Sequence, residues 1–386
     1  IAHKINGSYI PKKVTVKPEK PYLRERIIKN LPKEIGHIVH NYNFELVKSG
    51  EISVETFVSS LNNEELEALT RGQGGMDSNY GVAGNAGAFG GIIPELNKKG
   101  VPPVITTDGP AGIRVRKYTS LIPCGTALAS TFNTELVEKL TTEMGRELRN
   151  TGSNVLLAPG MNIHRNVLCG RNFEYFSEDP YLAGKCSASV INGVQSKGVG
   201  TSLKHFACNS QEAFRMVLNE VIDERTMREI YLPAFEIAVK ESQPWTVMNS
   251  YNRINGIYAS QNKHLQQDIL RDEWGFEGLI VTDWGASVDR IPGLENGTDL
   301  EMPSSGKLNQ NRIVAAVKNG ELDEAVLDER VDNVVNLIMK SKPALENEHT
   351  FDPKAHHAIA QKVAEGSMVL LKNDDKILPL KKGQKG

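Results

Sequence analysis

The chain has 386 residues, of which 39% are hydrophobic and 24% are charged, and its formal net charge is −2. This is the composition of an ordinary globular protein, and the near-neutral charge excludes classes that bind nucleic acid or anionic membranes through bulk positive charge. No apolar run reaches the roughly 18 residues of a membrane-spanning helix. We therefore expect no nucleic acid partner and no membrane.

The four cysteines, Cys124, Cys169, Cys186 and Cys208, do not form a CxxC pair, and no histidines cluster with them. A chain of this length does not depend on disulfides. The first residues lack the apolar segment of a signal peptide, although position 1 is not Met. We expect free thiols, no metal, no cofactor and a cytoplasmic location.

The N-terminal part, residues 1–54, is predicted to be an arm followed by a helical lead-in. Residues 1–23 are basic and contain proline, and a helical pattern begins at about Arg24. Residues 72–92 are rich in glycine, but no Gly-Lys-Ser/Thr follows. The pattern favours a flexible loop at the rim of a cleft over a phosphate-binding loop.

From about residue 100, strand and helix patterns alternate, which predicts parallel strands covered by helices. We count roughly six such units. An α/β fold with a TIM-type (β/α)8 barrel, or a slightly irregular one, is therefore inferred for residues 55–342. Strands are expected over 101–107, 155–159, 200–206, 245–251 and 278–282, with a further candidate at 299–302, and helices over 134–151, 180–197, 223–242, 262–272, 314–319 and 324–339.

Residues 343–386 are predicted to be a linker and the first elements of an incomplete α/β sandwich domain. Residues 355–365 have a helical pattern, 367–373 have a strand pattern, and Asp374-Asp375 indicates a turn. A lone strand cannot bury both faces, so we expect it to pack on the barrel or on another chain.

Four predicted strands end on polar groups: Asp108, the pair Lys204-His205, Tyr251 and Asp283. In a barrel, the first polar residue after a buried strand faces the cleft at the carboxyl end of the strands. The four strand ends therefore predict one polar pocket built from distant segments.

Each of these residues also has a purely structural interpretation. Asp283 could cap a helix, yet three similar strand ends favour a nucleophile kept ionised at neutral pH. Asp108-Gly-Pro is strong turn chemistry, but Asp108 with Arg114 also suits a ligand with neighbouring hydroxyls. Lys204 and His205 could be a satisfied interior pair, and Lys204 could also form a Schiff base, as in aldolases.

The segment 162–180 contains Arg165 and Arg171 beside three acids, Glu174, Glu178 and Asp179. These charges could form a structural network of ion pairs under a loop. For Arg171 we favour contact with a ligand, because guanidinium groups bind hydroxyls and carboxylates through several donors at once.

Five motifs in order resemble glycoside hydrolase family 3, the retaining β-glycosidases, over about residues 55–380. They are Thr107-Asp-Gly-Pro-Ala-Gly-Ile-Arg, Gly170-Arg-Asn-Phe-Glu-Tyr-Phe-Ser-Glu-Asp-Pro, Lys204-His-Phe-Ala-Cys-Asn, Met248-Asn-Ser-Tyr and Val281-Thr-Asp-Trp-Gly. In this family a barrel is typically followed by an α/β sandwich, and Ser367-Met-Val-Leu-Leu-Lys-Asn-Asp resembles the first strand of that domain.

The resemblance implies a role for each matching residue. Asp283 is the expected nucleophile, and Tyr251 is expected to hydrogen-bond either this nucleophile or the ring oxygen of the sugar. Met248 is expected to line the pocket, and Trp284 to provide an apolar platform for the sugar. The hydroxyl-binding set implied by the resemblance is Asp108, Arg114, Arg171, Lys204 and His205.

The acid/base residue is the gap in this assignment. In glucosidase-like members it is usually a Glu of the second domain, which this chain mostly lacks. The N-acetylglucosaminidase branch has an Asp-His dyad after the Lys-His motif, but Phe206–Ala213 contains no such His. Glu212 is more typical of a helix-start acid. We therefore expect the acid/base to lie outside this chain.

These observations predict a retaining, exo-acting β-glycosidase, a β-glucosidase that releases terminal β-D-glucosyl residues through a covalent glycosyl-Asp intermediate. The expected partners are β-linked glucosides or oligosaccharides, the remainder of the sandwich domain or a second chain, and possible further copies in a homo-oligomer. Three alternatives stay open: a sugar-binding barrel module that is inactive without its acid/base domain, β-xylosidase or another family 3 specificity, and a Schiff-base aldolase.

Overall fold

The computed structural model describes residues 2–5, 8–11, 41–346 and 350–383, which fall into two units divided between Val39 and His40. In the first unit, β1 (Ala2–Ile5) pairs antiparallel with β2 (Ser8–Pro11). The rest of the predicted arm and the start of the predicted helical lead-in lie outside the described residues. The second unit begins with two short helices, α2 (Phe44–Ser49) and α3 (Val54–Val58).

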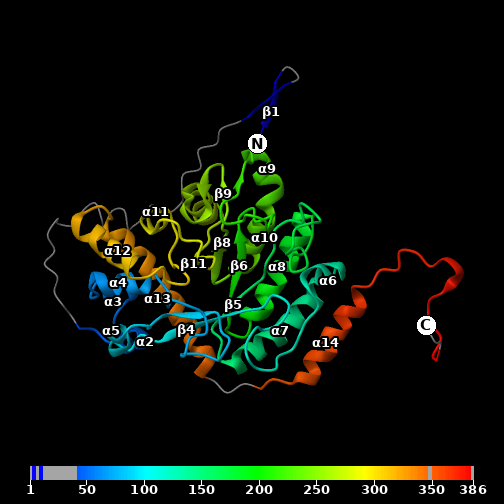
Figure 1. The fold of residues 1–386 in the computed structure, drawn as a ribbon, viewed down its shortest axis with the longest axis horizontal. Helices are drawn as coiled ribbons and strands as arrows, with labels where there is room; N and C mark the ends of the chain where they lie inside the picture. Colours follow the sequence, from blue (N-terminus) through cyan, green and yellow to red (C-terminus); the bar gives the residue numbers. More distant parts are fainter. Residues whose placement is uncertain (1, 6–7, 12–40, 347–349, 384–386) are drawn as a thin grey trace. The chain divides into compact units, whose positions relative to one another are not determined.

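The second unit is built on one six-stranded sheet in the order β11-β8-β6-β5-β4-β3 (Figure 1). The five strands from β4 to β11 are parallel, and β3 runs antiparallel to β4. The α/β class is therefore confirmed, and the regular strands form a curled mixed sheet, a half-barrel. Their bounds are β3 (Gly87–Gly90), β4 (Pro103–Asp108), β5 (Val155–Leu157), β6 (Gly200–Phe206), β8 (Thr246–Asn249) and β11 (Leu279–Thr282).

The strand β3 corrects the expectation of a flexible loop over 72–92. Its four residues, Gly-Ala-Phe-Gly, are all buried and pair with β4. Glycine permits a close approach of neighbouring backbone at the end of the strand: a Cβ added to Gly90 would lie 2.9 Å from the carbonyl oxygen of Pro102, and one added to the next residue, Gly91, 1.8 Å from that of Val101. The strand was missed because its small residues lack the apolar, β-branched character that identifies strands in sequence.

Helices cover both faces of the sheet. The remaining helices are α4 (Asn63–Leu69), α5 (Pro94–Lys98), α6 (Gly125–Ser130), α7 (Thr134–Thr151), α8 (Pro180–Gln195), α9 (Glu224–Thr226), η1 (Met227–Tyr231), α10 (Pro233–Ser242), η2 (Ala259–Gln261), η3 (His264–Glu273), α11 (Arg290–Glu295), α12 (Lys307–Asn319), α13 (Glu324–Glu346), α14 (Pro353–Gly366) and η4 (Asp374–Lys376). A small sheet of β10 (Ile257–Tyr258), β9 (Arg253–Ile254) and β7 (Asn219–Glu220) lies in the loops.

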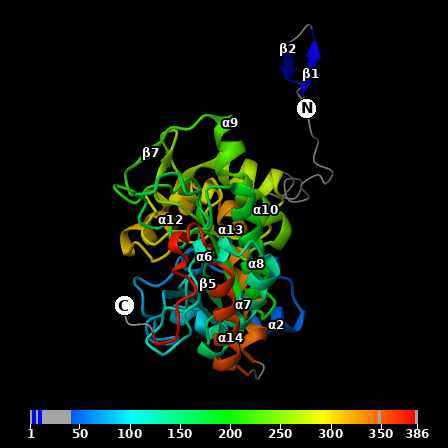
Figure 2. The ribbon, with the colours of Figure 1, turned by 90° about the vertical axis from the view of Figure 1, so that its right-hand side faces the viewer.

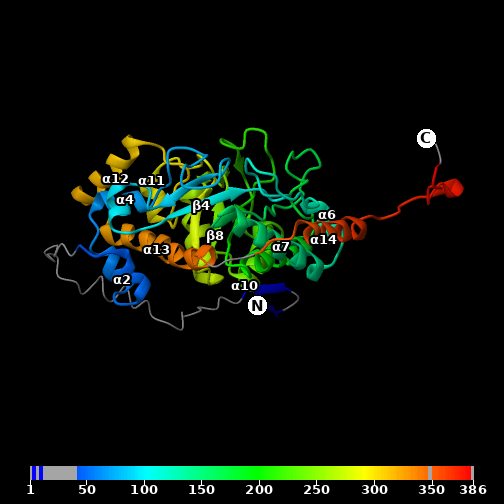
Figure 3. The same cartoon turned by 90° about the horizontal axis from the view of Figure 1, so that it is seen from below.

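Two apolar cores separate the helices by face, because successive strand residues point to opposite sides. Leu156, Leu203 and Ile280 pack with α7, α8 and α10, which lie beside one another in Figure 2. Val155 and Val281 pack instead with α3, α4 and α13. Of these helices, α4 and α13 are labelled in Figure 3, on the other side of the sheet from α7. This layering holds the carboxyl ends of the strands at one edge.

The helices predicted by apolar periodicity are present. The helix α7 has the predicted bounds, beginning after Asn133, whose side chain accepts from the backbone N–H of Leu136, and ending at Gly152 with φ +76°. The predicted helix 223–242 is interrupted by the π-helical turn η1 before Pro233, and η3 is also π-helical. The candidate strand at 299–302 contributes only single bridges at Leu300 and Glu301.

The predicted strand over 367–373 is wrong. These residues form no strand, and the four apolar side chains of Met368 to Leu371 are 61–91% exposed. Among the described residues no neighbouring strand is available to pair with them, which explains the missing regular structure. The turn predicted at Asp374-Asp375 is present as η4.

Within the described part of the chain, β11 and β3 are linked by isolated bridges alone: Val281 with Leu300, Arg71 with Glu301, and Gly72 with Phe89. We call residues 71–72 and 300–301 the seam. The backbone N–H of Gly72 donates to the carbonyl of Glu301 at 2.9 Å. The seam therefore connects the two ends of the curled sheet without forming a regular strand.

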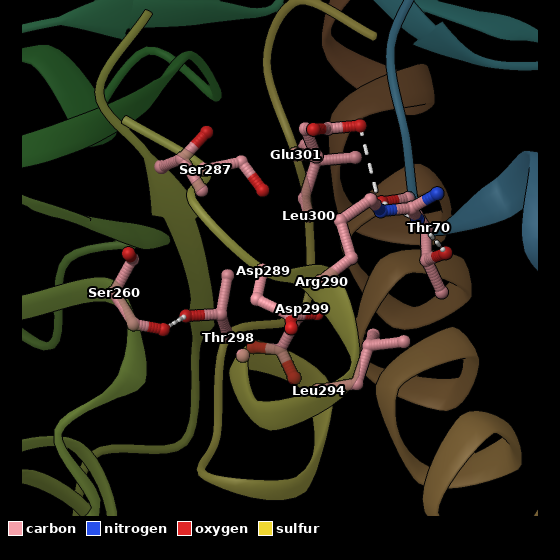
Figure 4. Close-up of a pocket in the computed structure, with 12 residues that line it drawn as sticks. Thr70, Ser260, Ser287, Asp289, Arg290, Leu294, Thr298, Asp299, Leu300 and Glu301 are labelled. Carbon is pink, nitrogen blue, oxygen red and sulfur yellow. Dashed lines mark hydrogen bonds and ion pairs between the residues drawn. The ribbon is translucent and has the colours of Figure 1, made fainter. Parts of the chain in front are cut away.

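A buried arginine stabilises the seam (Figure 4). Arg290 of α11 donates to Glu67 of α4 and to Oγ1 of Thr70, and its Nε lies 3.4 Å from Oε2 of Glu301. Arg290 is 7% exposed and both acids are less exposed still. The adjoining cavity, of about 10 Å³, has room for about one water molecule, so these charges have a structural role.

Candidate active site

One polar pocket of about 330 Å³ lies at the carboxyl ends of the strands. Pockets of a few hundred Å³ suit a small ligand such as one pyranose ring. All nine residues predicted for the site line it: Asp108, Arg114, Arg171, Lys204, His205, Met248, Tyr251, Asp283 and Trp284. Five further residues complete the lining: Met76, Ala86, Leu157, Glu174 and Arg215.

Asp108, the last residue of β4, is held between two cations. Its Oδ1 accepts from Nζ of Lys204 at 3.0 Å, and its Oδ2 lies 2.9 Å from Nη2 of Arg114. Burial raises the pKa of Asp108, but the charges of Lys204 and Arg114 outweigh burial and bring the pKa below its ordinary value of 3.8. Asp108 is therefore an ionised acceptor at neutral pH.

Lys204 and His205 both face the pocket although they are consecutive residues of β6. Successive residues of a regular strand point to opposite faces. The pairing of β6 with β8 shifts register between Lys204 and Phe206, as in a β-bulge, which re-aims the side chains there. Asn162 fixes this backbone, because its amide donates to the carbonyl of His205 and accepts from its N–H, both at 2.9 Å.

His205 is buried, at 1% exposure. Its Nδ1 lies 3.1 Å from the hydroxyl of Tyr175, and its Nε2 lies 3.6 Å from Oδ2 of Asp283. Burial, together with the charges of Arg171 and Lys204, lowers the pKa of His205 well below 6.5. The imidazole is therefore neutral at neutral pH.

Asp283 follows β11 and is 8% exposed. Its Oδ1 accepts from the backbone N–H of Trp284 at 2.7 Å, whereas its Oδ2 is buried without a hydrogen-bond partner among the described residues. Burial raises the pKa of Asp283 above 3.8, and the charges of Lys204 and Arg171 limit that rise. One carboxylate oxygen is thus free to react.

Tyr251 and Trp284 form the wall next to Asp283. The hydroxyl of Tyr251 donates to the carbonyl of Trp284 at 2.8 Å, and burial and the charge of Asp283 raise the pKa of this phenol. The indole Nε1 of Trp284 donates to the carbonyl of Ala86 at 2.9 Å, just before β3. The glycine-rich segment therefore anchors the aromatic wall of the pocket.

Glu174 and Arg215 were not predicted as pocket residues. Nε of Arg171 donates to Glu174, which is 8% exposed, and both residues line the pocket. Arg171 therefore forms the ion pair considered as the alternative, and it also lies where a ligand could contact it. Arg215 donates to Glu212 at 2.8 Å, and its Cζ lies 4.5 Å from the ring centroid of Tyr251. Glu174 shares a motif with Arg171, but no spacing identified Arg215.

The pocket offers three carboxylates with different chemistry. Both oxygens of Asp108 contact cations and Oε1 of Glu174 accepts from Arg171, whereas Oδ2 of Asp283 is buried without a hydrogen-bond partner among the described residues. Lys204 forms an ion pair with Asp108, whereas Schiff-base formation needs a neutral amine. This contact disfavours the aldolase alternative.

The described residues contain no group of three or more His, Cys, Asp and Glu that could hold a metal ion. Nor does any helix among them combine the length and apolar content needed to cross a membrane.

Known proteins share this architecture. Residues 91–337 match the model described as glycosyl hydrolase family 3 N terminal domain. The chain is 45% identical over 299 residues to thermostable beta-glucosidase B of Acetivibrio thermocellus, covering 74% of this chain and 40% of that protein. It is 44% identical over 340 residues to an exo-alpha-(1->6)-L-arabinopyranosidase of Bifidobacterium breve, covering 84% of this chain and 43% of that protein.

Solved structures agree. Beta-glucosidase 3B from Thermotoga neapolitana, in complex with glucose, matches with a TM-score of 0.80 and 42% identity, covering 85% of this chain and 48% of that one. A GH3 beta-glucosidase from Bifidobacterium adolescentis matches with a TM-score of 0.76 and 44% identity, covering 84% and 46%. This chain thus spans less than half the length of these relatives. The matched family model, the sequence identity and the shared fold together show that this chain belongs to glycosyl hydrolase family 3.

Proposed function

We propose that the chain carries the nucleophile half of a retaining, exo-acting β-glycosidase that removes terminal β-D-glucosyl residues. The observation that supports this most directly is the buried Asp283, whose free Oδ2 lies in a polar pocket of about 330 Å³. The relatives named beta-glucosidase and the glucose complex of one of them support glucose as the sugar.

In this mechanism the Oδ2 of Asp283 attacks the anomeric carbon as the bond to the leaving oxygen breaks, giving a glycosyl ester. Water then attacks the same carbon and releases the sugar and the carboxylate. The transition state has oxocarbenium character, so the ionised carboxylate stabilises it before the covalent bond is complete.

The ion-paired groups recognise the sugar. Asp108 accepts from neighbouring hydroxyls, while Lys204 and Arg171 donate to hydroxyl oxygens. Because these groups already hold one another in place, little ordering is needed when the sugar binds. Contacts to the 2-hydroxyl strengthen in the transition state of such reactions.

The acid/base is proposed to come from outside the described pocket residues. Asp108 and Glu174 are each bound to cations, so neither is a ready proton donor. The relatives are more than twice as long as the matched part of this chain, and the remainder of a sandwich domain or a second chain could supply the missing carboxyl group.

The experiment is incubation of the chain with 2,4-dinitrophenyl 2-deoxy-2-fluoro-β-glucoside, followed by intact mass measurement and peptide mapping. This leaving group departs with little acid assistance, so labelling does not need the acid/base. We expect one adduct, on Asp283, and none with Asp283→Ala. Labelling elsewhere, or turnover retained by Asp283→Ala, would remove Asp283 as the nucleophile.

A second specificity is favoured by one observation: the relative with 84% coverage of this chain is named an exo-alpha-(1->6)-L-arabinopyranosidase. Small changes in a pocket suffice to switch between pyranoses. Nitrophenyl β-glucoside, β-xyloside and α-L-arabinopyranoside should be compared as competitors of the labelling reaction. Protection by the arabinoside alone would replace glucose in the proposal, and saturable binding of a sugar by a chain that is never labelled would favour a sugar-binding module.

For the fold, we propose that the seam completes a barrel-like ring, that this catalytic region spans residues 55–342, and that 343–386 begins the sandwich domain. The bridges at Arg71 and Leu300 support the ring. Limited proteolysis should cut first outside residues 55–342 and leave the pocket region intact. A first cut inside 55–342 would argue against these boundaries.

A further inference from the structure

Tyr175 is a buried phenol that the mechanism above does not use. It has 0% exposure and lies behind His205, outside the pocket lining. Its hydroxyl is 3.1 Å from Nδ1 of His205 and 3.1 Å from Nδ2 of Asn209. The described residues provide this hydroxyl with no other hydrogen-bond partner, so its single proton has a limited choice of acceptors.

The orientation of Asn209 decides where that proton goes. The same Nδ2 donates to Oε1 of Glu212 at 3.0 Å. The flipped amide would place its oxygen against the carboxylate of Glu212, so Nδ2 faces both partners. Asn209 therefore donates to the hydroxyl of Tyr175, which in turn donates to Nδ1 of His205.

A ring nitrogen that accepts a hydrogen bond carries no proton, so Nδ1 of His205 is unprotonated and the proton of the neutral ring is on Nε2. Nε2 lies 3.6 Å from the free Oδ2 of Asp283. The other tautomer would direct a lone pair at this carboxylate and leave the proton of Tyr175 without an acceptor. Both effects favour the tautomer of His205 that carries its proton on Nε2.

We propose that Tyr175, oriented by Asn209, is a positioning residue that keeps the proton of His205 on Nε2, directed toward Asp283 and the sugar it attacks. The proposal deepens the function given above and rests on it for its catalytic consequence. The donor at Nε2 supports the charge of Asp283 in the free site and binds a sugar hydroxyl or the reacting oxygen when the pocket is filled. The position of the proton itself does not depend on turnover.

The test is long-range ¹H–¹⁵N correlation NMR on the full chain labelled with [¹⁵N]histidine. The His205 signals are identified by their loss in His205→Gln. We expect a pyrrole-type signal for Nε2 and a pyridine-type signal for Nδ1. The reverse pattern in the wild-type chain would overturn the proposal, whether or not the chain hydrolyses any glycoside.

Two variants then test the role of the hydrogen-bond chain. Tyr175→Phe removes the donor, and Asn209→Ala keeps the hydroxyl but no longer directs its proton, which provides a second route if the first variant does not fold. Each should move the His205 signals toward a mixture of tautomers. Unchanged signals in a folded variant would overturn the role of that residue.

The catalytic consequence is read from the labelling rate of Asp283. We expect Tyr175→Phe to slow labelling about ten- to a hundredfold, the range of one hydrogen bond to a charged group. Tyr181→Phe, which removes a hydroxyl from an exposed tyrosine of α8, is the matched control and should change neither readout. If the NMR signals show the expected tautomer but Asp283 is never labelled, the proposed function is contradicted and the proton assignment still stands.

Discussion

Oδ2 of Asp283 lies 3.6 Å from Nε2 of His205 and has no hydrogen-bond partner among the described residues. A buried acceptor without a partner costs free energy of folding. Here the acceptor without a partner is the carboxylate oxygen that would attack the anomeric carbon. The protein therefore leaves a reactive atom without a hydrogen bond, and the free-energy cost can be measured as stability.

Asp283→Asn should make the protein more stable at neutral pH. Burial raises the pKa of Asp283 above 3.8, so the ionised form is disfavoured in the folded state relative to the unfolded state. The folded state gains stability from this group as the pH falls through the raised pKa and loses it as the pH rises. We expect a gain of about 0.5–2 kcal/mol and complete loss of labelling, measured by urea unfolding and mass spectrometry.

The matched control for that variant is Asp268→Asn, because Asp268 is an exposed acid of η3 with loose contacts to Lys263 and His264. It should change neither stability nor labelling. A loss of stability in Asp283→Asn would mean that the carboxylate is better compensated than its surroundings indicate.

Asp108→Asn should have the opposite effect on stability. The pKa of Asp108 lies below 3.8, so this group stabilises the folded state above its unfolded pKa, and that stability is lost as the pH falls through the folded pKa. The substitution also leaves Lys204, at 4% exposure, without its anionic partner. We expect a loss of about 1–3 kcal/mol at neutral pH and weaker sugar binding, measured by urea unfolding and by protection against labelling.

Glu241→Gln is the control for Asp108→Asn, because it removes an acid from an exposed ion pair with Lys185. Exposed pairs contribute little to stability, and this one lies outside the pocket. If kcat/KM for an activated glycoside, or protection by a sugar, is the same in Asp108→Asn and the wild type, Asp108 does not bind the sugar.

His205→Gln should reduce the acid sensitivity of the fold. The pKa of His205 lies well below 6.5 because the ring is buried near cations. The unfolded chain therefore binds a proton at this residue before the folded chain does, and stability falls as the pH drops below about 6.5. The slope of unfolding free energy against pH between about 7 and 5 should decrease in His205→Gln and stay unchanged in the exposed control His357→Gln. Equal slopes in all three proteins would show that His205 protonates normally.

Arg290→Met should destabilise the seam. The substitution leaves Glu301 buried without its cation and leaves Glu67 with Arg71 alone. Removal of one partner of a buried ion pair typically costs about 3–5 kcal/mol. Arg312→Met removes a half-exposed arginine paired with Asp289 and serves as the control. Urea unfolding of both variants measures the difference, and equal stability would mean that the buried network makes no net contribution.

The sequence predicts much of this architecture because apolar patterns set the elements. The bounds of α7 follow directly from a helical apolar stripe, and β11 lies within the predicted apolar run 278–282. The polar residues at strand ends also converge, since parallel strands bring their carboxyl ends to one edge. These features depend on local pattern and on one topological rule.

What sequence reasoning missed depends on contacts between distant segments. β3 pairs with β4 because Gly90 and the following Gly91 fit against the backbone of Val101 and Pro102. Residues 367–373 form no strand because no partner strand lies beside them among the described residues. Arg215 reaches the pocket through Glu212 and the ring of Tyr251, which no spacing reveals. Such outcomes are fixed by three-dimensional neighbours, which composition and periodicity do not encode.

The seam links ligand binding to local opening of the sheet. The strand that presents Asp283 borders the seam, whereas Asp108 lies on β4, near the opposite end of the sheet. A sugar held by both aspartates would connect these two parts of the half-barrel and restrain their relative motion. Amide hydrogens at Gly72 and Glu301 should therefore exchange with solvent more slowly when the pocket is occupied, so that the least regular part of the sheet reports on its ligand.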